Sequence, residues 1–289
     1  MSATHPPCDA VAMRSGPWLG AALAALIAGC AARQAPGDPL SGRPIRTASP
    51  EELARRLVDD AAGLVALKGK VTLTFQERAA AGARSCRGAL AARSPWSDGA
   101  APGLFVEGYR SLMPTLFTLV SDGERFWLHV PSERVVYTGT TVRGVVARGR
   151  ELRLDARALL RALFVEPPGP ADALEVREDG ETYVLSIRRA GRLHRRLWVE
   201  RRRFAVEREV LYDADGREEL VILRERQRER DGRLQPERLS VQDPVAGGSV
   251  LVEFDSLTVN PPGLDARAFR PLSPPGARVE RVDGTERDR

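Results

Sequence analysis

Cysteine and histidine are the most chemically versatile side chains in this chain, and each type occurs only three times. They are Cys8, Cys30, Cys86, His5, His129 and His194. No two cysteines have the spacing of zinc ligands, and His5 lies in the leader. Neither His129 nor His194 has a nearby cysteine, aspartate pair or glycine-flanked serine. No nucleophile elbow, phosphate-binding loop or cofactor motif occurs. The sequence therefore predicts a protein that is not an enzyme and that holds no metal and no cofactor.

Cys30 differs from the other five because its thiol is itself an expected reaction site. The cysteine ends an apolar run that follows Arg14 and closes with residues 26–29, LIAG. This run is too short to span a bilayer comfortably and has the length of a signal-peptide core. The pattern resembles the bacterial lipoprotein signal, in which small residues precede the cut and the thiol carries a diacylglycerol. An ordinary secretory signal cleaved near Ala32 is the alternative.

Lipidation of Cys30 would hold the chain on a membrane, because two or more acyl chains anchor a protein stably where one is marginal. Ala31, as a residue other than aspartate after the anchor, resembles the outer-membrane class of lipoproteins. We therefore expect a lipid anchor in the outer membrane, on its periplasmic face. Cleavage before Cys30 would remove Cys8, and Cys30 would be acylated. Cys86 would then have no thiol partner, so we expect no disulfide and a buried Cys86.

Four segments are expected along the chain. They are a signal peptide at residues 1–29, the acylated cysteine and a tether at 30–48, a folded domain at 49–279, and a disordered tail at 280–289. Met13 makes a more usual signal start than Met1, so the true start codon is open. The tether is rich in proline and glycine, and a coil of that length spans roughly 25 Å. The tail is charged, which favours disorder.

The charge pattern argues against a nucleic-acid partner. The formal net charge is +5, and Lys68 and Lys70 are the only lysines. Arginines alternate with carboxylates, as in RERQRERDGR, which is typical of a solvated face of mixed sign. A surface that follows a phosphate backbone would keep its arginines clear of carboxylates. We expect no nucleic acid as partner, and a monomer.

Two helices and two runs of strands are expected in the folded domain. Ser49 and Pro50 begin one helix with a capping pattern, and Asp155 caps a second over residues 154–164. About six strands separate the helices and about seven follow the second, each marked by alternating apolar residues. Long antiparallel meanders must curl or close to manage their edges. The predicted fold class is α+β, mostly antiparallel β, forming an open half-barrel of about 11–13 strands with helices over the concave face.

Four stretches carry a family resemblance through their order and spacing. They are TLVSDGERFWLHVPSERVVYTG, AARSPWSDGAAPGLF, LWVERRRFAVEREVLYDADGR and FRPLSPPGARV. Together they resemble the outer-membrane lipoprotein-sorting (LolA/LolB-like) superfamily, over most of residues 50–280. The resemblance implies a half-barrel with a lid of helices and an apolar cavity that shelters lipoprotein acyl chains.

The resemblance suggests a function and leaves an alternative open. The first reading is an anchored protein that binds acyl chains of lipoproteins or phospholipids and takes part in lipoprotein or lipid trafficking in the envelope. The alternative is an envelope sensor or scaffold that uses the same fold to bind a protein and transports nothing.

Three residues have roles implied by the resemblance. Arg93 matches the strand-end arginine that pins the lid, although Ser94 stands between it and the proline that usually follows at once. A surface arginine is the alternative. Leu112 and Met113 lie between two strands and match a loop tip that touches the bilayer, or else belong to the core under a loop.

Strand alternation predicts the residues that line the cavity. The candidates are Val71, Leu73, Phe75, Phe126, Leu128, Tyr183, Leu185, Phe204, Val252 and Phe254. Trp127 and Trp198 lie on the opposite parity. Membership of an ordinary core is the alternative for each candidate.

The lipid anchor gives the first testable prediction. Radioactive palmitate fed to cells is expected to attach to the protein at position 30, because the thiol of Cys30 is the acylation site. Peptide mapping of the labelled protein measures this, and a chain without label at that position would have no such anchor.

Overall fold

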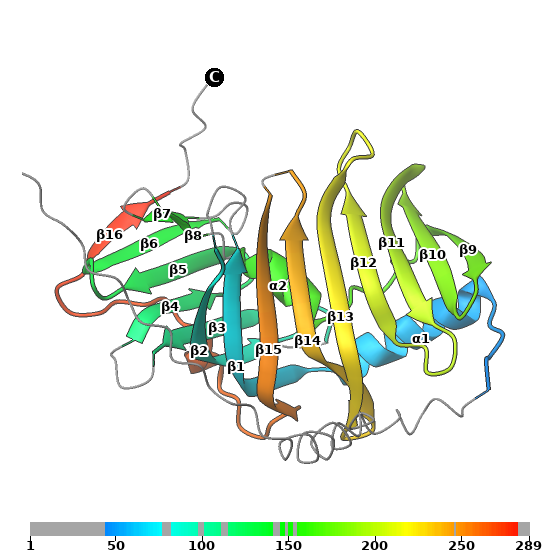
Figure 1. Ribbon diagram of the computed structural model, residues 1–289, viewed down its shortest axis with the longest axis horizontal. Coiled ribbons are helices and arrows are strands. Elements are labelled where there is room, and N and C mark those ends of the chain that lie inside the picture. The colour runs from blue at the N-terminus through cyan, green and yellow to red at the C-terminus, as the bar shows by residue number, and fades with distance from the viewer. Residues whose placement is uncertain are drawn as a thin grey trace, which may run out of the picture. The chain divides into compact units, whose positions relative to one another are not determined.

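The computed structural model describes residues 44–76, 82–97, 101–110, 115–140, 145–147, 150–152, 155–245 and 247–282, and Figure 1 shows their arrangement. Cys30, Leu112 and Met113 lie outside the described residues. The helices are α1, Pro50–Gly63, α2, Ala156–Leu163, and the short 3-10 helix η1, Ala266–Phe269.

Both predicted helix starts are confirmed. The Ser49 hydroxyl accepts a hydrogen bond from the Glu52 backbone N–H at 3.2 Å, and Pro50 occupies the first turn, where its missing N–H costs nothing. The Asp155 carboxylate accepts from the N–H groups of Arg157 and Ala158 at 2.8 and 3.3 Å. α2 is shorter than the predicted 154–164, because Asp155 caps it before Ala156 and the backbone of Phe164 is extended.

Strands make up most of the described chain. Their bounds are β1 Ala66–Gln76, β2 Arg84–Arg93, β3 Gly103–Tyr109, β4 Thr115–Ser121, β5 Arg125–Val130, β6 Val135–Thr140, β7 Val145–Ala147, β8 Arg150–Leu152, β9 Ala173–Asp179, β10 Thr182–Arg189, β11 Arg192–Glu200, β12 Val206–Tyr212, β13 Glu218–Arg230, β14 Arg233–Asp243, β15 Gly248–Val259 and β16 Arg278–Arg281. β7 and β8 pair only with each other within the described residues.

One sheet of 14 described strands runs in the order β16-β6-β5-β4-β3-β2-β1-β15-β14-β13-β12-β11-β10-β9. β1 pairs with β15, which joins the two halves of the chain at the middle of the sheet (Figure 1). β9 and β16 are the outer strands and do not pair with each other. The predicted α+β class with an open, mostly antiparallel sheet is therefore confirmed.

The strand count and the end of the domain need correction. Fourteen strands exceed the predicted 11–13, because β16 adds to β6 in parallel at the edge of the sheet. Backbone bonds from Arg278 N to Arg134 O at 2.9 Å and from Val282 N to Thr138 O at 3.0 Å hold it there. Order therefore extends past residue 279, where a disordered tail was expected to begin. With only one apolar residue in four, β16 has no alternation to reveal it.

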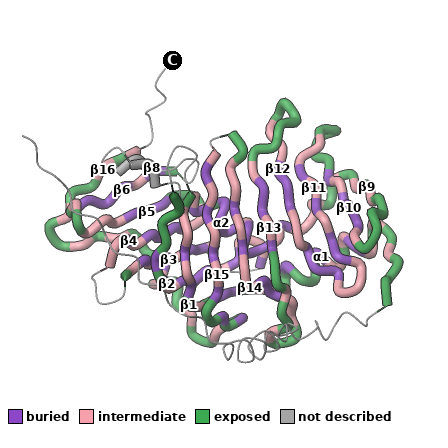
Figure 2. The backbone as a smooth tube through the Cα atoms, viewed as in Figure 1, coloured by how far each residue is buried: buried purple, intermediate pink, exposed green. Residues whose placement is uncertain are grey.

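Cross-strand register places apolar side chains from both halves of the chain on one face, here called the inner face. Leu73 stands opposite Val252 and Cys86, and Leu185 stands opposite Leu197. Opposed residues point to the same side of a sheet, so these pairs extend the face from strand to strand. Figure 2 shows the resulting alternation of buried and less buried positions along the strands.

Both helices pack on the inner face. Leu159 and Leu163 of α2 belong to a core cluster with Leu73, whereas Leu53 and Leu57 of α1 belong to a second cluster with residues of β10, β11 and β12. The inner face is thus covered in two parts. α2 packs on one cluster of core residues and α1 packs on the other.

The described chain is fixed to the sheet before α1 begins. The Tyr183 hydroxyl donates to the Arg46 carbonyl at 2.8 Å and accepts from the Ala48 N–H at 2.7 Å. The Arg46 N–H donates to the Arg201 carbonyl at 3.2 Å. Residues 46–48, predicted as part of the tether, are therefore bound to β10 and the turn after β11.

A pair of alanine substitutions on β1 tests the assignment of faces. Leu73→Ala should lower the free energy of unfolding by about 2–5 kcal/mol, because it empties a fully buried site on the inner face. Thr74→Ala, one residue on and on the opposite face, should cost less than about 1 kcal/mol. Urea denaturation measures both, and equal losses would contradict the assignment.

Candidate binding site

A buried arginine fastens the end of α2 to the sheet. Arg224 of β13 is 4% exposed and donates from Nε to the Ala162 carbonyl at 3.0 Å and from Nη2 to the Arg161 carbonyl at 2.9 Å. The last carbonyls of a helix have no partners within the helix, and its C-terminal end favours a cation. Arg224, on the inner face of the sheet, donates hydrogen bonds to these carbonyls and places a positive charge at the C-terminal end of α2.

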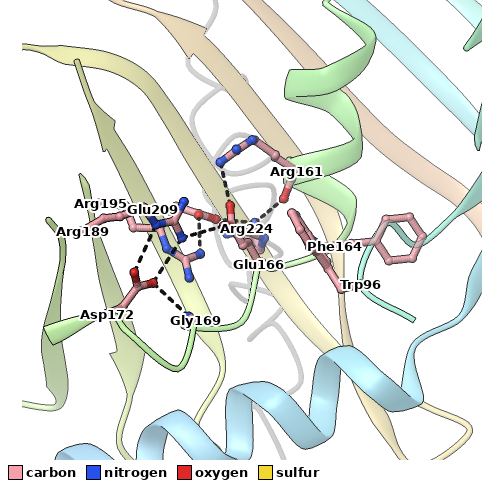
Figure 3. A network of polar contacts seen from close by, with 10 residues as sticks. All are labelled: Trp96, Arg161, Phe164, Glu166, Gly169, Asp172, Arg189, Arg195, Glu209 and Arg224. Atoms are coloured by element: carbon pink, nitrogen blue, oxygen red, sulfur yellow. Dashed lines mark hydrogen bonds and ion pairs between the residues drawn. The ribbon is translucent and has the colours of Figure 1, made fainter. Parts of the chain in front are cut away.

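Three charged side chains lie side by side on adjacent strands beneath this contact. Glu209 of β12 accepts from Arg224 Nη2 at 2.9 Å and from Arg195 Nη1 of β11 at 3.3 Å. Arg195 is 0% exposed and Glu209 is 1% exposed. Figure 3 shows how these residues converge below the end of α2. Such burial of ions is tolerated only with compensating partners.

A second set of ion pairs continues the first along the segment after α2. Glu166 forms ion pairs with Arg161 at 2.9 Å and with Arg189 of β10 at 3.1 Å. Arg189 also donates to both carboxylate oxygens of Asp172, at 3.1 and 3.2 Å. The Gly169 N–H donates to Asp172 at 2.9 Å (Figure 3). The polar residues form one network, the buried arginine cluster, made of Arg161, Arg189, Arg195, Arg224, Glu166, Asp172 and Glu209.

The arginines keep the neighbouring carboxylates ionised. Burial opposes ionisation of Glu166, but Arg195, Arg161 and Arg189 together hold its pKa below the ordinary value. Hydrogen bonds from Arg189, acting against burial, lower the pKa of Asp172 in the same way. Carboxylates that are more acidic in the folded state stabilise it at neutral pH, and this contribution is lost as the pH falls through their folded pKa values.

A cavity of about 400 Å³ lies beside α2. It is lined by Pro95, Trp96, Pro102, Gly123, Glu124, Thr140, Arg157, Leu160 and Arg161. The Trp96 indole N–H donates to the Phe164 carbonyl at 3.3 Å, which holds this wall against the end of the helix. Because Arg161 lines the cavity and also contacts Glu166, the cavity and the buried arginine cluster share a side chain.

The predicted cavity residues gather on the inner face. Register places nine of the ten on one side of the sheet, and Phe204 lies in the turn before β12, stacked on Tyr183 with ring centroids 6.4 Å apart. All are buried except Phe75, which is half-buried. They are packed within the two core clusters, and none of them is among the residues that line the 400 Å³ cavity.

Arg93 contacts the C-terminal segment of the domain. Its Nη2 donates to the Leu264 carbonyl at 2.7 Å, and its guanidinium lies 5.3 Å from the centre of the Phe269 ring. The Phe269 ring belongs to η1, and no contact from Arg93 to α1 or α2 is among the interactions of the described residues. Since Ala92 points into the core, alternation turns Arg93 to the opposite face. The arginine that contacts the last turn of α2 is Arg224 instead.

Cys86 lies where the sequence predicted it. It is a free, buried thiol on the inner face of β2, and burial raises its pKa. No cluster of metal-ligating side chains occurs among the described residues. None of the helices in the described part of the chain is long and apolar enough to cross a membrane.

The buried arginine cluster was missed because the mixed charge pattern was interpreted as a solvated face. That interpretation fails at Arg195, Glu209 and Arg224. The sequence nevertheless contained a sign of the cluster in the way that residues of each strand alternate between the two faces. Arg195 shares its strand parity with Leu197, and Arg224 shares its parity with Ile222, so each follows the apolar positions inward.

Comparisons with known proteins identify the fold. No protein-family model matches the chain, and no curated protein matches it. A crystal structure described as an outer membrane lipoprotein-sorting protein domain from Vibrio parahaemolyticus is similar, with a TM-score of 0.53, 12% identity, and coverage of 75% of this chain and 94% of that one. A DUF1329 family protein from Desulfovibrio piger gives a TM-score of 0.52, 14% identity, and coverage of 75% and 94%.

A LolA superfamily protein from Nitrosomonas europaea is also similar, with a TM-score of 0.49, 11% identity, and coverage of 78% of this chain and 98% of that one. The protein thus has a LolA/LolB-like fold, as the sequence resemblance predicted.

The cap of α2 gives a prediction of pH dependence. Burial raises the pKa of Asp155 from 3.8 to about 6, so the folded state keeps a proton that the unfolded chain has lost between these values. The free energy of unfolding should therefore fall as the pH rises through this window. Asp155→Asn retains a capping side chain without the titration, so the variant should gain stability relative to the natural protein from pH 4 to 7. Urea unfolding at each pH measures this, and a constant difference would contradict it.

Proposed function

We propose that this protein is an outer-membrane-anchored lipoprotein that binds the acyl chains of lipoproteins or lipids and serves their trafficking in the cell envelope. The observation that carries the proposal is the single apolar inner face, to which strands from both halves of the chain contribute. The LolA/LolB-like fold supports it. The inner face is the concave face of the half-barrel in this proposal, and α1 and α2 form its lid.

Cargo binding requires that the lid moves, because the inner face is filled in the described structure. Val71, Leu73 and Leu185 have no exposed surface. An entering acyl chain would replace the side chains of α2 against the sheet. Each methylene removed from water contributes about 0.8 kcal/mol, but exchange of one apolar surface for another returns little net free energy. The binding would therefore be reversible without any chemical step.

Arg224 is the residue that we assign to closing the lid. Its two hydrogen bonds to the last turn of α2 must break when the helix leaves the sheet. A buried hydrogen bond to a charged group contributes about 1.5–3 kcal/mol. Opening would lose both bonds, and this free-energy cost favours the closed state. Binding of cargo would have to offset the cost before the lid could open.

The membrane connection completes the proposal. Acylated Cys30 would fix the protein to the outer membrane on its periplasmic face, and Leu112 and Met113 would touch the same bilayer. In this scheme Arg93 pins the C-terminal segment, through Leu264, rather than the lid.

Site-specific photo-crosslinking in cells tests acyl binding at the inner face. Phe75→p-benzoylphenylalanine places a crosslinker at a half-buried inner position, and Phe105→p-benzoylphenylalanine places the same group at a half-buried position of opposite parity. With palmitate-labelled cells, the crosslink to labelled lipoprotein or lipid should form at Phe75 and be at least several-fold weaker at Phe105. Equal labelling, or none at either position, would contradict the proposal.

The filled interior favours a second function, that of a sensor or scaffold without transport. A closed core needs no cargo, and the two helices would then act as parts of a stable protein-binding module. The same experiment separates the functions, because a scaffold would crosslink to a partner protein without palmitate label. Depletion of the protein should leave lipoproteins at the inner membrane only if it sorts them.

A further inference from the structure

The buried arginine cluster has more positive than negative charge. Its four guanidinium groups are those of Arg161, Arg189, Arg195 and Arg224. Its three carboxylates belong to Glu166, Asp172 and Glu209. Arg189 is 47% exposed, so water screens its charge, whereas Arg195 and Arg224 are buried and share a single carboxylate, that of Glu209. This buried pair therefore has one positive charge without a carboxylate of its own. An uncompensated buried charge carries a large desolvation penalty, so such a charge calls for a counter-ion.

The excess charge is located by the unpartnered N–H groups. Nε and Nη2 of Arg195 and Nη1 of Arg224 have no hydrogen-bond partner among the described residues, although they are fully buried. Arg195 uses only Nη1, at 3.3 Å from Glu209. Buried N–H donors almost always have an acceptor, so a missing acceptor belongs beside these two side chains.

Neighbouring side chains make no hydrogen bond to these donors among the described residues. Glu166 Oε2 also lacks a hydrogen bond, but it lies 2.9 Å from Nη1 of Arg161 and forms an ion pair with that guanidinium. Asp155 lies at the opposite end of α2, about 12 Å along the helix, and caps its first turn. His194, beside Arg195, has a pKa lowered by burial and by Arg189, and its Nε2 has no partner either. Glu124 lines the cavity on the strand side and is exposed.

We propose that the buried arginine cluster binds one singly charged oxyanion, a phosphodiester or carboxylate, through Arg195 and Arg224. A planar guanidinium presents paired donors that match such groups, and one negative charge would balance the cluster. The source is either the head group of an acidic amphiphile or a free anion such as inorganic phosphate. This inference rests on the proposed function only for the apolar part of the ligand.

The adjoining cavity is suited to the rest of an amphiphile. Arg161 lies on both the cluster and the cavity, and Pro95, Trp96 and Leu160 give the cavity apolar walls. A ligand with an acidic head and an apolar tail could thus place the head at the cluster and the tail beside α2. An acidic phospholipid has this chemistry.

The test uses the full chain in a non-ionic detergent and the variant Arg195→Met. Methionine has a similar length, leaves Glu209 paired with Arg224, and reduces the cluster to equal numbers of opposite charges. Arg208→Met is the matched control, because Arg208 lies on the opposite face, 4.5 Å from the ring of Trp198. Arg195→Lys serves as a second variant, which keeps the charge if the methionine variant does not fold.

Three probes are titrated against each protein at constant ionic strength set with chloride. They are inorganic phosphate, dihexanoyl phosphatidylglycerol and dihexanoyl phosphatidylcholine, and binding is measured as the rise in melting temperature with probe concentration. The natural protein and Arg208→Met should respond to phosphatidylglycerol or phosphate. Arg195→Met should bind the same probe at least about tenfold more weakly, since a hydrogen bond to a charged group is lost. Arg195→Lys should give an intermediate affinity.

The outcomes separate the two ligand sources and the two proposals. Tighter binding of phosphatidylglycerol than of phosphate supports the head group of an amphiphile as the ligand. Binding of phosphate without binding of phosphatidylglycerol supports a free anion. No response of the natural protein to either anion, or an equal response from Arg195→Met, overturns the anion site. Acyl crosslinking at Phe75 could still succeed in that case, so failure of this inference is distinct from failure of the proposed function.

Discussion

The structure depends on one constraint. The apolar inner face of a wide, open sheet must be shielded from water by two short helices. Only two helices of the described chain lie on that face (Figure 1). The second, α2, has only 8 residues. Helices this short do not persist by propensity alone. They are held by capping side chains at their first turns and, for α2, by Arg224 at its last carbonyls. The cover is thus secured through backbone groups, which need no particular side chain on α2 itself.

The polar groups that secure the cover also divide the interior. The buried arginine cluster lies where the core under α2 gives way to the core under α1, so it separates two apolar regions. Replacing buried ion networks by apolar side chains often stabilises a protein, so their presence favours a role beyond stability. Under the two proposals above, that role is to couple the closure of α2 to the charge of the bound ligand.

The sequence predicted the parts that obey local rules. Ser49 and Asp155 were recognised as caps because their hydrogen bonds are made within the next turn, and alternation placed Leu73 and Leu185 on one face. The cluster was not predicted, because its partners lie on β10 to β13 and after α2 and meet only when the sheet forms. β16 was missed for a similar reason, since its pairing with β6 depends on chain segments far apart in sequence.

The bonds between Tyr183 and residues 46–48 have a mechanical consequence. A pull transmitted through the preceding chain would reach β10 before it reached α1, because the Tyr183 hydroxyl holds both Arg46 and Ala48. The load would thus be borne by a strand with ladder bonds on both sides. In the proposed anchored protein, movement of the anchor would therefore act on the sheet before it acted on α1.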